Sequence, residues 1–115
     1  MTVQRISPAY PVENLSAAVE LLTALIGEPT FVDGERFAQF DANGARVMLA
    51  GADRDADLPF LAIKVDDLDD VVNRLRASGF TISEPVRGPH ERRAALRIEG
   101  ESSWYISVYE PLIGS

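Results

Sequence analysis

The chain has 115 residues, of which 46% are hydrophobic and 25% charged, and its formal net charge is −7. This length and composition suit one domain with a modest core. The acidic balance disfavours nucleic-acid binding, because a negative surface repels phosphate backbones. The absence of cysteine excludes disulfides, thiolate metal sites and a cysteine nucleophile. No apolar stretch is long enough to span a bilayer. We therefore expect a cytoplasmic protein with no membrane and no nucleic-acid partner.

The first half of the chain predicts a strand, a helix and three further strands. Residues 3–12 form a mixed apolar run that is typical of a strand. Asn14 suits the N-cap of a helix whose apolar residues follow helical spacing, and Gly27 and Pro29 end that helix. The turn pairs Asp33-Gly34 and Asn43-Gly44 then separate short strand-like runs. These runs are residues 30–32, 36–40 and 46–50.

The same order of elements begins again after a charged segment, residues 51–57, which we interpret as a linker. Residues 58–65 predict a strand, and Asp67 predicts the N-cap of a helix that ends at Gly79. Further strands are expected at residues 80–83, 92–98 and 103–109, separated by turns at residues 87–91 and at Glu99-Gly100.

The two halves repeat each other in register. The helix starts Val12-Glu13-Asn14-Leu15 and Val65-Asp66-Asp67-Leu68 lie 53 positions apart. Residues 46–49 match residues 105–108 at an offset of 59. A half with this element order cannot bury its own sheet face, so two such modules are expected to share a core.

Duplicated modules with helix starts of this V-x-D-L type resemble the vicinal oxygen chelate superfamily, which includes glyoxalase I, the bleomycin-resistance proteins and the extradiol dioxygenases. The resemblance covers nearly the whole chain. It implies an α+β fold in which two βαβββ modules form a curled mixed sheet around a cleft, with the helices outside, and it implies a homodimer. We expect a single domain, residues 1–115. Its first module spans residues 1–50, its linker residues 51–57 and its second module residues 58–115.

The resemblance also locates the positions at which metal-dependent members hold their ion. In those members a His, Gln or Glu heads the first strand of each module, and a further ligand, usually Glu, lies midway along the last strand. The matching residues here are Ser7, Met48, Phe60 and Ser107. A phenyl ring offers no donor, a thioether suits hard ions poorly, and neutral hydroxyls are weak ligands. We therefore predict no metal, no other cofactor and no catalytic residue.

Alternation along the strands predicts which side chains line the cleft. Successive side chains of a strand point to opposite faces, so Ile106 and Val108 should face the helix while their neighbours face the cleft. In the second module the cleft side then carries Phe60, Ala62, Lys64, Arg93, Ala95, Arg97, Tyr105, Ser107 and Tyr109. An apolar and aromatic lining with few polar groups is typical of small-molecule sites and suits a flat ligand. As ligand-binding residues we select Ser7, Met48, Phe60, Arg93, Tyr105, Ser107 and Tyr109.

Ordinary structural roles compete with these interpretations. Phe60, Met48 and Tyr105 could fill the cleft as core residues. His90, the only histidine, has a pKa that suits a general base, but its turn offers no evident orienting partner. The acids of residues 66–70 lie at a helix start, where they offset the helix dipole.

The predicted function is the binding of a small, partly aromatic organic molecule by a metal-free member of this superfamily, for sequestration or resistance. The acidity favours a cationic ligand weakly and is explained first by solubility. One alternative is a metal-dependent lyase, isomerase or dioxygenase with shifted ligands such as His90, Glu101 or Glu110. Another is a protein whose cleft is filled and which acts through its dimer surface. The fold alone does not choose among them, because this superfamily hosts many chemistries.

Overall fold

The computed structural model describes residues 3–52 and 54–112. Residue 53 of the predicted linker and the outer ends of both predicted modules lie outside the described residues. The chain divides into two compact units. The N-terminal unit contains residues 7–59. The C-terminal unit contains the chain from Phe60 onward together with the start of the first strand, up to Ile6.

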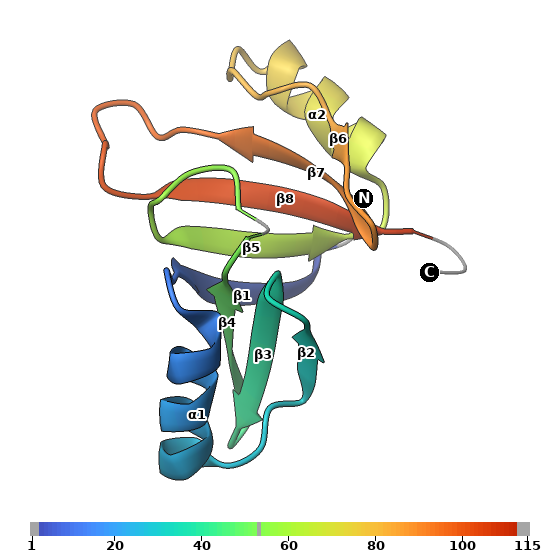
Figure 1. The fold of residues 1–115 in the computed structure, drawn as a ribbon. Helices are drawn as coiled ribbons and strands as arrows, with labels where there is room; N and C mark the ends of the chain where they lie inside the picture. Colours follow the sequence, from blue (N-terminus) through green and yellow to red (C-terminus); the bar gives the residue numbers. More distant parts are fainter. Residues whose placement is uncertain (1–2, 53, 113–115) are drawn as a thin grey trace. The chain divides into compact units, whose positions relative to one another are not determined.

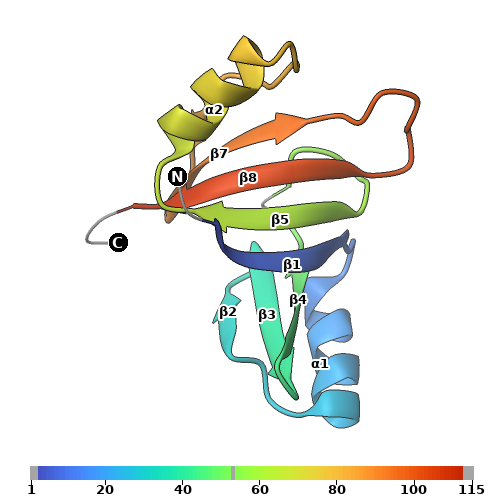
Figure 2. The same ribbon diagram turned by 180° about the vertical axis from the view of Figure 1, so that it is seen from behind.

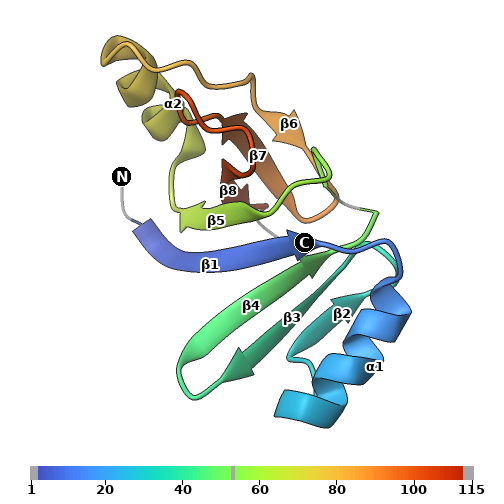
Figure 3. The ribbon, with the colours of Figure 1, turned by 90° about the vertical axis from the view of Figure 1, so that its left-hand side faces the viewer.

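The N-terminal unit consists of a mixed sheet with one helix packed on it. β1 (Val3–Pro11) runs parallel to β4 (Ala45–Ala50), and β4 pairs antiparallel with β3 (Phe37–Ala42). β3 pairs antiparallel with β2 (Phe31–Asp33), and Figure 3 shows β4, β3 and β2 side by side in that order. α1 (Leu15–Ile26) contacts β3 and β4 from one face of this sheet (Figure 1).

The C-terminal unit repeats this plan. β5 (Phe60–Val65) runs parallel to β8 (Tyr105–Pro111), and β8 pairs antiparallel with β7 (Glu91–Leu96). β7 pairs with the two-residue strand β6 (Val86–Arg87). α2 (Leu68–Ala77) packs on β7 and β8, which is visible from the reverse side in Figure 2. The order βαβββ therefore occurs twice, as the predicted fold class requires.

Both helices begin where the sequence predicts. The Asn14 side chain accepts a hydrogen bond from the backbone N–H of Ala17 at 3.0 Å, and the Asp67 side chain accepts one from Asp70 at 3.1 Å. These caps satisfy amides that have no partner within the helix. α1 ends at Gly27, whose φ of 107° favours glycine. Neither helix among the described residues is long and apolar enough to cross a membrane.

Each unit has its own core between helix and sheet. The residues that form it follow the alternation of the strands and the apolar stripe of the helix. In the N-terminal unit the buried members are Leu15, Ala38, Phe40 and Leu49. In the C-terminal unit they are Val65, Leu68, Val71, Val72, Ile82, Ala94 and Val108, with Ile63, Leu75, Leu96 and Ile106 packed against them.

One predicted strand is wrong. Residues 80–83 do not form a strand, although Ile82 is buried in the core as a strand residue would be. The N–H of Ala95 bonds to the Ser83 hydroxyl at 2.8 Å instead of a backbone carbonyl, and Pro85 has no N–H to donate. The short strand β6 therefore starts only after this proline. The other strand bounds differ from the predicted ones by at most two residues.

Candidate functional site

The face of the C-terminal sheet that points away from α2 gathers the residues that alternation predicted. We call it the helix-free face, and its side chains alternate with those of the core. The register of β5, β8 and β7 arranges nine of them in three rows. The first row is Phe60, Tyr105 and Arg97, the second Ala62, Ser107 and Ala95, and the third Lys64, Tyr109 and Arg93.

The first row is an aromatic wall with a cation at one end. The rings of Phe60 and Tyr105 are stacked, with centroids 5.1 Å apart and planes inclined by 24°. The guanidinium carbon of Arg97 lies 5.1 Å from the centroid of the Tyr105 ring, a cation–π distance. Tyr105 is only 1% exposed and therefore supports the wall from within. Phe60 and Arg97 are the members that retain exposed surface.

The second row is a floor of small side chains. Ala62 is 2% and Ser107 4% exposed, while Ala95 is partly exposed. Along a strand, residues two apart are separated by about 6.6 Å, so the Cα atoms of the first and third rows lie roughly 13 Å apart.

The third row contributes two cations beside a tyrosine. The Arg93 guanidinium bonds to the carboxylate of Glu91 at 3.0 Å, and Glu91 lies two residues earlier on the same strand. Lys64 is partly buried and makes no ion pair with any residue in the described ranges. Among the described residues the three rows hold three cations, Lys64, Arg93 and Arg97. Two carboxylates lie next to the third row in the sequence: Glu91, which is bound to Arg93, and Asp66, two residues after Lys64.

Two further predicted site residues lie in the N-terminal unit. Met48 of β4 is in register with Ala9 of β1, so Ser7, two residues before Ala9, shares the face of Met48. That face points away from α1. Ser7 is fully buried, and its hydroxyl has no hydrogen-bond partner among the described residues. Each unit therefore places its own two predicted positions on neighbouring strands, Ser7 with Met48 and Phe60 with Ser107.

Comparison with known families decides the membership of this chain. Residues 5–108 match the model of the Glyoxalase/Bleomycin resistance protein/Dioxygenase superfamily. The chain belongs to this superfamily. The match covers both βαβββ modules, which confirms the resemblance seen in the sequence. A comparison with curated protein sequences gave no significant match.

Solved structures of low sequence identity share the fold of this superfamily member. A structure described as an NAD-dependent benzaldehyde dehydrogenase from Legionella pneumophila has a TM-score of 0.82 at 14% identity, with 94% of this chain and 100% of that chain covered. A superfamily member from Vibrio splendidus 12B01 has a TM-score of 0.61 at 14% identity, covering 96% and 100%. Methylmalonyl-CoA epimerase from Mycobacterium tuberculosis has a TM-score of 0.63 at 19% identity, with 96% of this chain and 87% of that chain covered. At these identities the likeness shows the fold alone.

The residues at the metal positions of the superfamily do not fit a divalent ion. Ser7 and Met48 in one unit, and Phe60 and Ser107 in the other, offer two neutral hydroxyls and one thioether. Among the described residues, no group of three or more His, Asp or Glu side chains is placed to hold a metal. A divalent site needs several oxygen or imidazole donors that converge on the ion. The metal-free state stays a prediction, because the donor set alone does not measure metal content.

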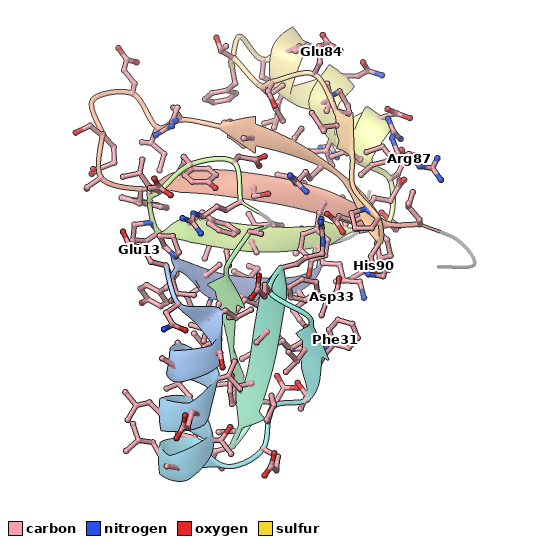
Figure 4. The ribbon with its side chains drawn as sticks, in the orientation of Figure 1. Glu13, Phe31, Asp33, Glu84, Arg87 and His90 are labelled. Atoms are coloured by element: carbon pink, nitrogen blue, oxygen red, sulfur yellow. The ribbon has the colours of Figure 1, made fainter. Side chains whose placement is uncertain are left out.

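The shifted metal ligands considered from the sequence are not brought together. His90 lies in the turn between β6 and β7, as Figure 4 shows. Glu110, near the end of β8, accepts a hydrogen bond from the first amide of α2, that of Leu68, at 3.0 Å. Glu101 precedes the start of β8, where hydrogen bonds from Ser103 lower its pKa. Glu110 lies near the far end of β8, whereas Glu101 lies in the turn that precedes its first residue.

The acids at the start of α2 have structural partners. Asp67 caps the helix, Asp69 receives two hydrogen bonds from Arg92 at 3.0 and 3.2 Å, and Asp70 lies 3.9 Å from Arg74. The hydrogen bonds from Arg92 hold the pKa of Asp69 below its usual value. These contacts support the interpretation that the acids stabilise a helix start.

A separate hollow of about 370 Å³ lies in the N-terminal unit, lined by the described part of loop 51–57. Arg54 holds this loop. Its guanidinium bonds to Asp57 at 2.6 Å, to the carbonyl of Val12 at 3.1 Å and also to the carbonyl of Gly51. The hollow surrounds the guanidinium of Arg54, whose hydrogen bonds hold loop 51–57 against the end of β1. We assign it a structural role.

Proposed function

We propose that this protein binds a small, partly aromatic organic molecule on the helix-free face of its C-terminal unit, without a divalent metal. The observation that carries the proposal is the floor of small side chains between the Phe60–Tyr105 wall and the row of Lys64 and Arg93. A ring laid over this floor contacts apolar surface and meets polar groups at its ends. That combination is typical of small-molecule sites.

The same face supports binding better than catalysis. A general acid–base reaction needs a carboxylate, an imidazole or another titratable group within hydrogen-bond reach of the substrate. Of the carboxylate and imidazole groups most often used for this chemistry, Glu91 bonds to Arg93, and His90 lies outside the three rows in the turn before β7. To Lys64 and Tyr109 we assign the polar end of a binding site. Sequestration or self-resistance requires only that the ligand is held. We propose this role.

We also propose that the protein is a homodimer, as the resemblance to the superfamily implies. The described part of α1 leaves two leucines one turn apart on its surface, Leu21 and Leu25, which are 62% and 68% exposed. Exposed apolar side chains of this size are common at protein–protein contacts. Light scattering at micromolar concentration should give twice the mass of one chain, and a single-chain mass would contradict this proposal.

The proposed function can be tested by NMR titration of the ¹⁵N-labelled protein with one- and two-ring aromatic compounds. Amide shifts should concentrate at residues 60–64, 93–97 and 105–109. Phe60→Ala should weaken binding at least tenfold, because the exposed part of the wall is removed. Phe31→Ala is the matched control, since Phe31 is an exposed aromatic of β2 that packs on Phe37 in the other unit. No binding, or equal weakening by both variants, would reject the proposed site.

A further inference from the structure

We infer that the ligand carries a negative charge and that Lys64 binds it; this inference rests on the proposed function. Lys64 is the only lysine of the chain, against ten arginines and eighteen acids. It lies partly buried on β5 in the helix-free face. It makes no ion pair with any described carboxylate, although Asp66 follows two positions later.

Among the residues that the structure describes, no carboxylate forms an ion pair with Lys64. Removing an ammonium from water costs free energy unless a hydrogen-bonded counter-charge replaces the lost hydration. Glu91 could supply such a charge, but it bonds to Arg93 at 3.0 Å. Arg97 faces the ring of Tyr105, a contact that leaves its positive charge uncompensated. The helix-free face is therefore positive within a chain whose net charge is −7, and it attracts anions locally.

The geometry favours a carboxylate attached to an aromatic ring system. Lys64 stands in the third row and the Phe60–Tyr105 wall in the first, roughly 13 Å apart along the strands. A ring over Ala62 and Ser107 would contact Phe60 with its far edge and place its anionic group near Lys64. Because an ammonium is a compact point charge with three donors, a single negative charge satisfies it. The proposed class is aromatic monocarboxylates of one or two rings.

Three ligands of one shape test the charge directly by calorimetry at pH 7.5: 2-naphthoate, 2-naphthamide and 2-naphthylmethylammonium. The naphthoate should bind at least tenfold more tightly than the amide, and the ammonium should bind most weakly. Lys64→Met should lower the affinity for the naphthoate to that for the amide. The affinity for the amide itself should change by less than twofold. Arg87→Met removes the same charge from β6 (Figure 4), where Arg87 pairs with Arg92 and therefore lies on the face opposite Arg93. It should leave all three affinities unchanged.

The single lysine allows a second readout that needs no substitution. Reductive ¹³C-methylation labels Lys64 and the chain's amino terminus while keeping the ammonium charge. The dimethyl-lysine resonance should shift on adding naphthoate and not on adding amide at equal occupancy. If the amide binds as tightly as the naphthoate, or if Lys64→Met keeps the preference for the anion, the inference is wrong and the proposed function stands. If none of the three ligands binds, both are wrong.

Discussion

The helix-free faces of the two units are built on the same register and filled with different chemistry. In the N-terminal unit the middle row places two long side chains, those of Met48 and Gln39, beside Ala9. In the C-terminal unit the middle row consists of small residues: Ala62, Ser107 and Ala95. The same backbone plan therefore carries long side chains in the middle row of the first unit and small ones in the middle row of the second.

The rows next to these differ in the same way. In the N-terminal unit Arg46 makes two hydrogen bonds with Asp41, at 2.6 and 2.8 Å, so a carboxylate neutralises its charge. At the position equivalent to Arg46 the C-terminal unit has Tyr105, and the cation Arg97 faces an aromatic ring. Duplication preserves the strands and their register, while the side chains on the helix-free faces differ between the two units.

The largest expected effect on stability comes from truncating the buried ring of Tyr105 in the C-terminal unit. Tyr105→Ala should lower the free energy of unfolding by about 3–5 kcal/mol, because it leaves a cavity beneath Phe60. Arg46→Ala at the equivalent position should cost about 1 kcal/mol, because it breaks a partly exposed ion pair. Urea denaturation measures both. Equal costs would show that the two rows do not differ as described.

A large side chain in the middle row of the C-terminal unit should make it resemble the middle row of the N-terminal unit. Ala95→Leu places a branched side chain in the middle row and should weaken binding of an aromatic ligand at least tenfold, or about 1.4 kcal/mol. Gln39→Leu makes the corresponding change in the N-terminal unit and should leave the affinity unchanged. Calorimetric titration of both variants gives the answer. Tight binding by Ala95→Leu would mean that the ligand lies elsewhere.

The attachment of the helices also differs between the units. Glu110 accepts the hydrogen bond of the Leu68 amide, whereas the equivalent position in the first unit is Gly51, where a Cβ would clash with the carbonyl of Glu35. Glu110→Ala should cost about 1 kcal/mol in unfolding free energy. Glu110→Gln keeps an acceptor and should cost less than half as much. If both variants lose the same free energy, the loss comes from the negative charge of Glu110 near Arg92 and not from its hydrogen bond.

The smallest effect concerns the exposed pair of Asp69 and Arg92. Hydrogen bonding to Arg92 lowers the folded-state pKa of Asp69. The pair therefore stabilises the folded state fully above the usual aspartate pKa of about 3.9. This stabilisation is lost as the pH falls through the lowered pKa. Asp69→Asn should therefore lower Tm slightly at pH 7, and the difference should vanish in acid. Glu28→Gln, which breaks no ion pair with a described residue, is the control. A difference that grows in acid would reverse the assigned sign.

Local signals account for what the sequence could predict. The caps Asn14 and Asp67 and the alternation of the strands depend on neighbours in the chain, and the structure confirms them. The strand expected at residues 80–83 fails because a side-chain hydroxyl, that of Ser83, takes the place of a ladder carbonyl. Alternation placed Lys64 on the correct face but did not single it out. Whether a cation has a partner depends on contacts between strands that are distant in the sequence.

The central claim is that the superfamily's metal positions have lost their ion and that the protein binds its ligand without one. The direct measurement is elemental analysis of the protein purified without an affinity tag or chelator, followed by thermal shifts with nickel, zinc, manganese and iron(II). We predict well under one metal ion per chain and no shift with any of the four. One tightly held ion per chain, lost in Ser7→Ala or Ser107→Ala, would contradict the claim. It would favour the alternative that the protein is a metal-dependent enzyme.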